Sequence, residues 1–280
     1  MIRNVSKCYI LLPLVAVSMI FAGCTSQKEQ PFPSTIPTQV ARATQTPVKQ
    51  VELTISAAAS LTDALKEIQT NYESKNKHIK LNFNFGASGA LQQQIEQGAP
   101  ADLFLSAATK NMNTLLDKQL IDPAQHKNLL INELVVVVPS DSKTTVQKIE
   151  DLTVNAIKHL AVGEPLTVPA GSYAKEALTN ANLWNPLQTK IVQGKDVRQV
   201  LTYVESANAE AGFVYKTDAL TSQKVKIAFH VDPKTYTPIE YPIGVVKATK
   251  NSKDTTDFYT YLQSKEAQDV FIKFGFSIPK

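Results

Sequence analysis

The sequence predicts an α/β fold with mainly parallel sheets, and two observations lead to this prediction. Along residues 51–280, stretches that alternate apolar and polar residues take turns with stretches whose apolar residues recur every three or four positions. The order strand, turn, helix therefore repeats, which is typical of α/β proteins. Cys8 and Cys24 both precede this region, so it can hold no disulfide and must be stabilised by a buried core.

The first two strand–helix units show the pattern most clearly. VELTIS at residues 51–56 alternates apolar and polar residues, and apolar residues from Leu61 to Tyr72 then follow at helical spacing. Ser60 and Asp63 are spaced like the two residues of a capping box at the start of that helix. HIKLNFNF at residues 78–85 is the next predicted strand, and it runs through GASGA into the helical LQQQIEQG.

The same order continues along the rest of the chain. Further strands are predicted at residues 101–107, 133–139, 159–163, 190–194, 212–215, 225–231 and 241–246. Helices are predicted near residues 110–118, 173–183, 197–207 and 255–274.

Four strand-to-helix junctions indicate a ligand site. In open α/β sheets, ligands bind beyond the carboxyl ends of the strands, where helix N-termini meet. Helix N-termini offer free N–H groups and a positive dipole end, and small residues let a ligand approach them closely. Together the junctions predict an anion site. They are AAAS at residues 57–60, GASGA at residues 86–90, VPAGSYA at residues 168–174, and GKDV at residues 194–197, where Asp196 could cap the following helix.

Each of these features also has a simpler structural interpretation. Ser60 could be a helix N-cap, the commonest role of a serine at a helix start. GASGA could be a tight turn, and VPAGS a loop with proline in the first helical turn. Tyr215 could be a strand tyrosine with a buried ring. Taken one at a time, these interpretations are favoured, and it is the set that indicates a binding site.

The N-terminal segment is typical of an exported protein. Residues 1–23 hold Arg3 and Lys7, followed by an apolar run from Tyr9 to Phe21 that is too short to span a membrane, as in a secretory signal. Ala22, Gly23 and Cys24 resemble the lipobox of bacterial lipoproteins, although Phe21 departs from the leucine usual there. The resemblance implies a lipidated Cys24, and the alternative is an ordinary signal with an incidental cysteine.

Residues 24–50 and the charge distribution limit the partners. The segment from Thr25 to Gln50 is rich in Thr, Gln and Pro and has no apolar period, so it is predicted to be a flexible tether. Residues 1–50 hold five basic residues and one acidic residue, which accounts for the whole formal charge of +4. Residues 51–280 are therefore neutral overall, which argues against binding to nucleic acid.

Other classes of protein find little support. Gly86, Ser88 and Gly89 approximate a nucleophile elbow, but Ala90 stands where that motif needs glycine. None of the four histidines lies in a motif that points to a catalytic triad, and no close His, Asp and Glu cluster suggests a metal site. A lipoprotein that binds only protein partners would leave the four junctions unexplained.

Seven segments of the chain resemble the periplasmic molybdate-binding proteins of ABC importers. They occur in the order seen in that family and extend over residues 51–280. The resemblance implies a two-lobed type II periplasmic binding fold with the ligand between the lobes. It suggests residues 51–132 with 241–280 for lobe one and residues 133–240 for lobe two. The segments are AAASLTDAL, the serine after FNF, GAPADLFLSA, AVGEPLTVPAGSYAKEAL, DVRQVLTYVE, AGFVYKTDA and EYPIGVV.

The resemblance also implies the ligand and the residues that hold it. Family members bind molybdate or tungstate as an oxyanion, without a metal cofactor. Ser60 and Ser88 correspond to serines that give hydroxyl and backbone N–H, Ala170 and Val197 to residues that act through backbone N–H, and Tyr215 to a phenolic donor. The family often has a more serine-rich turn where this chain reads GASGA, so Gly86 and Gly89 are expected to alter the affinity.

Such donors suit an oxyanion that carries no proton. Several oriented N–H and O–H groups can replace the water of a dianion without a cation. Phosphate near neutral pH keeps a proton and needs an acceptor, which this set supplies poorly. Sulfate is the alternative ligand, because only the size of the cavity would exclude it. By resemblance, the protein is expected to be a monomer in the cell envelope, outside the cytoplasm, that serves a membrane permease and its ATPase.

Overall fold

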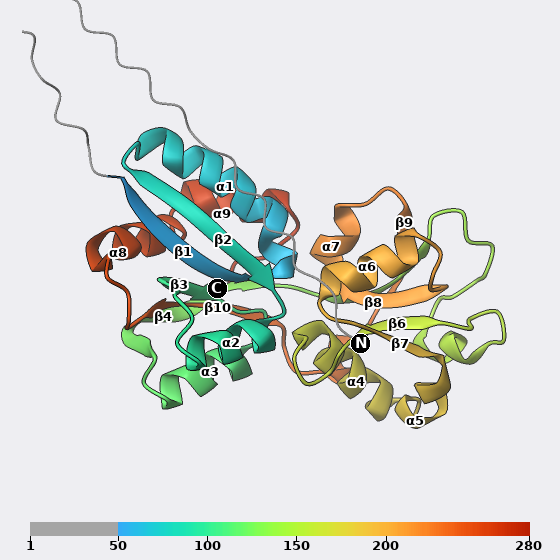
Figure 1. The fold of residues 1–280 in the computed structure, drawn as a ribbon. Coiled ribbons are helices and arrows are strands. Elements are labelled where there is room, and N and C mark those ends of the chain that lie inside the picture. Colours follow the sequence, from blue (N-terminus) through green and yellow to red (C-terminus); the bar gives the residue numbers. More distant parts are fainter. Residues whose placement is uncertain (1–49) are drawn as a thin grey trace, which may run out of the picture. The chain divides into compact units, whose positions relative to one another are not determined.

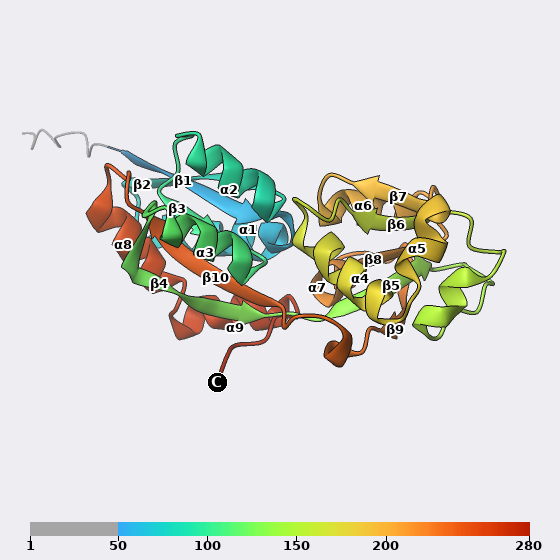
Figure 2. The same cartoon turned by 90° about the horizontal axis from the view of Figure 1, so that it is seen from below.

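The computed structural model describes residues 50–280, and in this part of the chain ten strands form two five-stranded sheets flanked by helices (Figures 1 and 2). Each sheet with its helices forms one lobe, so the predicted α/β, two-lobed architecture is confirmed. The predicted signal segment, Cys24 and the tether up to residue 49 lie outside the described residues. Among residues 50–280, no helix combines the length and the apolar character needed to cross a bilayer.

The first lobe contains the sheet with strand order β2-β1-β3-β10-β4. Its strands are β1 (Val51–Ala58), β2 (Ile79–Gly86), β3 (Leu103–Leu105), β4 (Ile121–Ile131) and β10 (Glu240–Val246). Its helices are η1 (Ala59–Leu61), α1 (Thr62–Lys75), α2 (Ser88–Glu96), α3 (Thr109–Asp117), α8 (Ser252–Tyr261) and α9 (Lys265–Lys273).

The second lobe contains the sheet with strand order β7-β6-β8-β5-β9. Its strands are β5 (Leu134–Pro139), β6 (Leu160–Gly163), β7 (Ile191–Gly194), β8 (Ala211–Tyr215) and β9 (Val225–His230). Its helices are η2 (Ile149–Thr153), α4 (Pro169–Asn180), α5 (Trp184–Leu187), η3 (Gln188–Lys190), α6 (Val197–Glu205), α7 (Lys216–Leu220) and η4 (Pro233–Thr235).

One strand in each sheet runs against the others, so the sheets are mixed rather than mainly parallel. β1, β2 and β3 pair in parallel, as do β6, β7 and β8, whereas β10 and β5 pair antiparallel with both of their neighbours. The reason is the path of the chain. β5 and β10 are the strands by which the chain enters a lobe after leaving the other one, so they start at the junction of the lobes, where the parallel strands end.

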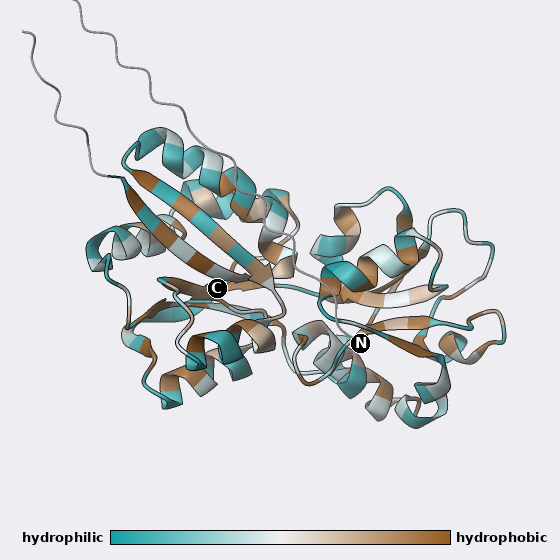
Figure 3. Ribbon diagram, in the orientation of Figure 1, coloured by the Kyte–Doolittle hydropathy of each residue, from teal (hydrophilic) through white to brown (hydrophobic). Residues whose placement is uncertain are grey.

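The hydrophobic pattern explains the layers. Buried apolar side chains of both sheets and of their helices form one extensive cluster, and a smaller cluster lies beneath α2 and α3. Figure 3 shows hydrophobic residues along the strands and a mixture of hydrophilic and hydrophobic residues along the outer helices. On β1, Leu53 and Ile55 are fully buried, in line with the alternation predicted for VELTIS.

The predictions of elements were incomplete, as β4 and the C-terminal helices show. The strand β4 was not predicted, because IDPAQHKNLLI contains Pro123 and lacks regular alternation. The helix predicted near residues 255–274 is two helices, and Ser264 caps the second by accepting a hydrogen bond from the Ala267 N–H at 3.3 Å.

Candidate functional site

All five binding residues predicted from the resemblance line one cavity at the junction of the two lobes. The cavity holds about 200 Å³ of empty space, a volume that includes its opening to solvent. No residue that lines it is charged. The lining consists of Ala58, Ala59, Ser60, Gly86, Ala87, Ser88, Ala107, Val168, Pro169, Ala170, Val197 and Tyr215.

The strand pairing brings the four junctions together. In the first lobe, Ala58 at the end of β1 lies opposite Gly86 at the end of β2, so the chain turns from both strands toward helices side by side. In the second lobe, Gly163 at the end of β6 lies opposite Gly194 at the end of β7. The starts of α2, α4 and α6 and the short helix η1 therefore surround the cavity.

Local sequence leaves backbone donors available at these helix starts. Pro169 is the first residue of α4, where its missing N–H costs nothing, and Ala170 follows it. Asp196 caps α6 as predicted, because its carboxylate accepts the Gln199 N–H at 2.9 Å, and Val197 is the first residue of that helix. The first N–H groups of a helix have no partner within it, so those of Ala170 and Val197 are free for a ligand.

Close packing of backbone brings the start of α4 to the cavity. A Cβ atom on Gly171 would lie 1.9 Å from the carbonyl oxygen of Gly163, so only glycine permits this approach of α4 to β6. The proline and the glycine of VPAGSYA are therefore both explained by the position of the helix start that they form.

Ser60 does not cap a helix. No side chain caps α1, and the predicted capping box with Asp63 is absent, because Ser60 lies within η1 rather than before the helix. Its hydroxyl instead makes a buried 2.9 Å hydrogen bond with the hydroxyl of Tyr241.

The other two hydroxyl groups at the cavity are also buried. Ser88 Oγ accepts the backbone N–H of Ala107 at 2.9 Å. The hydroxyl of Tyr215 is buried and has no hydrogen-bond partner within residues 50–280. Burial, reinforced by the neighbouring Tyr241, raises the pKa of Tyr215 well above its usual value, so its phenol stays protonated and can donate.

The two lobes contact each other around the cavity. The backbone N–H of Gly89 donates to the carbonyl of Thr167 at 2.9 Å, and the Tyr173 hydroxyl donates to the carbonyl of Ala107 at 3.3 Å. A Cβ atom on Gly89 would lie 2.7 Å from the Thr167 oxygen, so the absence of a side chain there allows this contact. On Gly86, a Cβ atom would meet only Leu91, at an ordinary 3.6 Å.

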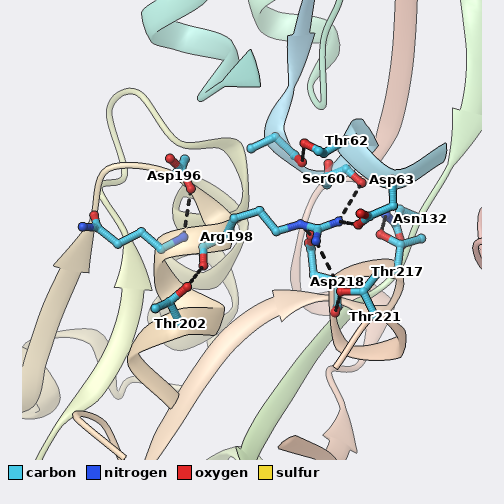
Figure 4. Close-up of polar contacts among 12 residues, drawn as sticks. Ser60, Thr62, Asp63, Asn132, Asp196, Arg198, Thr202, Thr217, Asp218 and Thr221 are labelled. Carbon is cyan, nitrogen blue, oxygen red and sulfur yellow. Dashed lines mark hydrogen bonds and ion pairs between the residues drawn. The ribbon is translucent and has the colours of Figure 1, made fainter. Parts of the chain in front are cut away.

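A charged cluster, formed by Arg198, Asp63 and Asp218, lies beside the cavity (Figure 4). The guanidinium of Arg198 on α6 contacts Asp63 of the first lobe at 2.7 Å and Asp218 of the second lobe at 2.6 Å. It also donates to the carbonyl of Ser60 at 3.5 Å. The cluster therefore joins the lobes next to two of the predicted binding residues, Ser60 and Val197.

Burial and ion pairing act in opposite directions on this cluster. Burial raises the pKa of Asp218 to about 6, although Arg198 favours its charged form. Burial also acts against the charge of Arg198, but the carboxylates of Asp218 and Asp63 outweigh it and raise the pKa of Arg198. The ion pairs of Arg198 therefore offset part of the cost of burying these charges.

The sequence did not single out Arg198, Asn132 or Tyr241. Arg198 directly follows Val197 in DVR, and that position was its only signal. Asn132 and Tyr241 stand where the chain passes between the lobes, and their contacts join residues 85 to 181 positions apart. Contacts between residues so far apart in the sequence cannot be recognised from a short motif.

The histidines lie away from the cavity. His78, His159 and His230 each face a carboxylate, at 3.4, 3.6 and 3.0 Å respectively, and His126 contacts the carbonyl of Pro123. Among residues 50–280, no group of three or more His, Cys, Asp or Glu side chains is arranged to hold a metal ion. In the described part of the chain, Ser88 thus has no histidine beside it that could act as a base.

The fold and the cavity between two lobes define a class of protein, and a family comparison agrees. Residues 53–277 match the family of bacterial extracellular solute-binding proteins, and the chain belongs to this family. It is therefore an extracellular binding protein and not an enzyme, which removes the hydrolase alternative.

Individual relatives narrow the class. The chain is 46% identical to the candidate ABC transporter substrate-binding lipoprotein YvgL of Bacillus subtilis. The match extends over 271 residues, which are 97% of this chain and 98% of that protein. It is 42% identical to the molybdate-binding protein ModA of Haemophilus influenzae, over 81% of this chain and 90% of the relative. Among solved structures, the substrate-binding domain of a candidate molybdenum ABC transporter from Clostridium difficile is 45% identical, with a TM-score of 0.64 over 82% of this chain and 100% of that chain.

Proposed function

We propose that this protein captures molybdate, and tungstate as a second ligand, outside the cytoplasm and delivers it to an ABC importer made of a membrane permease and its ATPase. One observation carries the proposal: an uncharged cavity between two lobes is lined by two serines, a tyrosine and three helix starts. The relatives named as molybdate-binding proteins, at up to 42% identity, support the choice of ligand.

Each residue has a defined role in this proposal. Ser60 and Ser88 bind the oxyanion through hydroxyl and backbone N–H, Ala170 and Val197 through backbone N–H, and Tyr215 through its phenolic hydroxyl. The unpartnered hydroxyl of Tyr215 supports its role, because a buried polar group without a partner costs free energy that a ligand would recover.

A site of neutral donors is suited to a dianion. Hydrogen bonds to a charged acceptor are roughly twice as strong as those between neutral groups, and donors held by helices do not reorganise when the ion arrives. The positive ends of the helix dipoles add to this attraction. The donors therefore replace the hydration of the anion without a cationic side chain in the cavity.

Ligand binding would favour the arrangement in which the lobes meet. In the proposed division, residues 51–132 with 241–280 form lobe one and residues 133–240 form lobe two. Ser60 and Ser88 then belong to lobe one and the other three binding residues to lobe two. Only the closed arrangement offers both sets of contacts, so the ligand shifts the equilibrium toward it.

The proposal includes a lipid anchor. Cys24 would be lipidated after removal of residues 1–23, and residues 25–50 would tether the binding domain to the membrane. The relative from Bacillus subtilis that carries the word lipoprotein in its name matches 97% of the chain, which supports this part of the proposal. Mass spectrometry of the membrane-extracted protein tests it, and unmodified Cys24 would contradict it.

Isothermal titration tests the ligand. The purified protein is titrated with molybdate, tungstate, sulfate and phosphate, and the same is done with Ser88→Ala and Tyr215→Phe. We expect molybdate and tungstate to bind tightly. Each substitution should lower their affinities roughly 10- to 100-fold, which is the effect of losing one hydrogen bond to a charged group.

Two matched controls keep the test specific. Ser74→Ala removes an exposed hydroxyl on α1 that donates to the carbonyl of Asn71, and Tyr261→Phe removes a tyrosine hydroxyl that does not line the cavity. Both should bind like the wild type. Preference for sulfate would assign the protein to another oxyanion importer, and no binding of any of the four ions would refute the proposal.

A further inference from the structure

The two places where the chain passes between the lobes are joined by a chain of hydrogen bonds that ends at Ser60. Asn132 directly follows β4, and Tyr241 is the second residue of β10. Both are buried, at 7% and 1% exposure. Neither lines the cavity, yet Asn132 contacts Tyr241 at 3.2 Å and Tyr241 contacts Ser60 at 2.9 Å.

The orientation of the Asn132 amide follows from its backbone neighbour. The N–H of Glu133 can only donate, and it lies 2.9 Å from Asn132 Oδ1, so this atom is the oxygen. The amide nitrogen therefore faces the opposite way and donates to Thr217 Oγ1 at 2.9 Å and to the hydroxyl oxygen of Tyr241 (Figure 4 shows Asn132 beside Thr217).

The direction of the next bond follows from that orientation. Tyr241 accepts a hydrogen from Asn132, so its own hydrogen needs an acceptor, and Ser60 Oγ is the remaining partner in the described part of the chain. A buried hydroxyl hydrogen without an acceptor is unfavourable, so Tyr241 donates to Ser60. Burial raises the pKa of Tyr241 well above its usual value, so the phenol keeps this hydrogen.

Ser60 is left with its own hydrogen to direct into the cavity. Its oxygen already accepts from Tyr241, just as Ser88 Oγ already accepts from the N–H of Ala107. Ser60 lies in η1 and Ser88 begins α2, and each already accepts from a different donor, so each needs an acceptor in the cavity for its own hydrogen.

We propose that Tyr241 and Asn132 are positioning residues that hold the Ser60 hydroxyl as a donor and thereby set the preference of the site for oxyanions without a proton. This inference rests on the proposed function. A protonated oxyanion such as hydrogen phosphate must donate one hydrogen bond. If Ser60 accepted this bond with its remaining lone pair, its own hydrogen would lose the ligand as an acceptor, so the bond is disfavoured. The residues act through Ser60 and do not touch the ligand.

A double-mutant cycle between Tyr241 and Ser60 tests the inference. Tyr241→Phe keeps the ring, which packs edge-on against Tyr215 and Phe276, and removes only the hydroxyl. Molybdate and phosphate are titrated into the wild type, Tyr241→Phe, Ser60→Ala and the double variant. We expect Tyr241→Phe to lower the affinity for molybdate about tenfold and to bring the molybdate and phosphate affinities closer together. In the double variant, Tyr241→Phe should lower the affinity no further than Ser60→Ala does alone.

The control is Tyr72→Phe, which removes the hydroxyl of another buried tyrosine in the first lobe and should change neither affinity. A second variant, Asn132→Asp, places an acceptor beside Tyr241, so the tyrosine hydrogen turns toward it and away from Ser60. We expect the same loss of molybdate affinity and the same smaller difference between the molybdate and phosphate affinities. Thermal unfolding of each variant shows whether it is folded.

The outcomes separate the inference from the proposed function. The inference would be overturned if Tyr241→Phe lowered the molybdate affinity equally in proteins with and without the Ser60 hydroxyl, because Tyr241 would then act by another route. Molybdate binding by Tyr241→Phe or by Asn132→Asp equal to that of the wild type would overturn it too, while the proposed function stands. A wild type that binds no molybdate would instead remove the proposed function, and the inference with it.

Discussion

The cavity and the charged cluster beside it lie at the same junction between the lobes, but they differ in the charge of their residues. The cavity has no charged residue, whereas Arg198 lies within salt-bridge distance of both Asp63 and Asp218. Val197 of the cavity and Arg198 of the cluster are neighbours in the chain. Because Arg198 is already paired with two carboxylates, its charge is not free for an anion. In the proposed site, dipoles therefore hold the ligand, whereas ion pairs help to hold the lobes together.

The largest effect is expected when a backbone dipole is removed from the cavity. Val197→Pro deletes the N–H at the first position of α6, where proline fits, and Asp196 before it is already extended, with φ −157° and ψ 171°. We expect molybdate affinity to fall roughly 10- to 100-fold, as measured by titration, while α6 remains folded. Val197→Ala shortens the same side chain but keeps the N–H, and it should bind nearly as the wild type does. Equal losses in both variants would mean that the side chain matters and the N–H does not.

The next effect concerns the contact between lobes at the edge of the cavity. Gly89→Ala places a Cβ atom against the Thr167 carbonyl, so we expect at least about a tenfold loss of affinity. The same change should raise the thermal stability of the unliganded protein, since alanine favours a helix by up to about 1 kcal/mol over glycine. Gln93→Ala is the control, because it changes an exposed side chain of the same helix that does not line the cavity. If Gly89→Ala bound as tightly as Gln93→Ala, closure would not depend on this glycine.

A smaller effect is expected from breaking the ion pair between the lobes. Asp63→Asn removes the partner of Arg198 in the first lobe and leaves its pair with Asp218 in place. Both side chains are partly exposed, so we expect about a two- to fivefold loss of molybdate affinity, reduced further at high salt. Glu67→Gln, also on α1, breaks a pair with Lys273 inside the first lobe and should leave the affinity unchanged. The role of the cluster in closure would be disproved by a loss of the same size in the control.

Substitution of Asp218 is expected to have the smallest effect on binding. Its main effect should be on the pH dependence of the free energy of unfolding. Its pKa is raised to about 6 in the folded protein, from 3.8, so the folded state binds the proton more tightly than the unfolded chain. The resulting stability is present below about pH 4 and is lost as the pH rises to about 6. Urea unfolding should show the wild type losing up to about 3 kcal/mol relative to Asp218→Asn across this range. Parallel pH curves for the two proteins would contradict the assignment.

The site could be predicted from the sequence where its residues lie in short segments. AAAS, VPAGSYA and DVR each carry a helix start within a few residues, so the pattern and the resemblance together located Ser60, Ala170 and Val197. The partners of those residues could not be found in this way. Tyr241 is 181 positions from Ser60, and Asp63 is 135 positions from Arg198. Pairing at such separations depends on how two lobes meet, which no local propensity encodes.

The strands illustrate the same limit. Most strands were predicted because apolar alternation or a continuous apolar run marks them, as in VELTIS and ELVVVVP. The mixed character of the sheets was not, because strand direction depends on the path of the chain between the lobes. Ser60 was misjudged as a possible cap for a similar reason: its true partner, the Tyr241 hydroxyl, belongs to a strand near the other end of the chain.

The cavity wall is shared by both lobes, and this has a kinetic consequence. In the proposed site, an ion between Ser88 on one side and Ala170 on the other is held by donors of both lobes, and the hydrogen bond from Gly89 to Thr167 helps to keep the lobes together. Its residence time is then governed by how often the lobes separate, a property of the protein rather than of the ion. Molybdate and tungstate should leave at nearly the same rate, and a membrane partner that holds the lobes apart would release either one without competing for its donors.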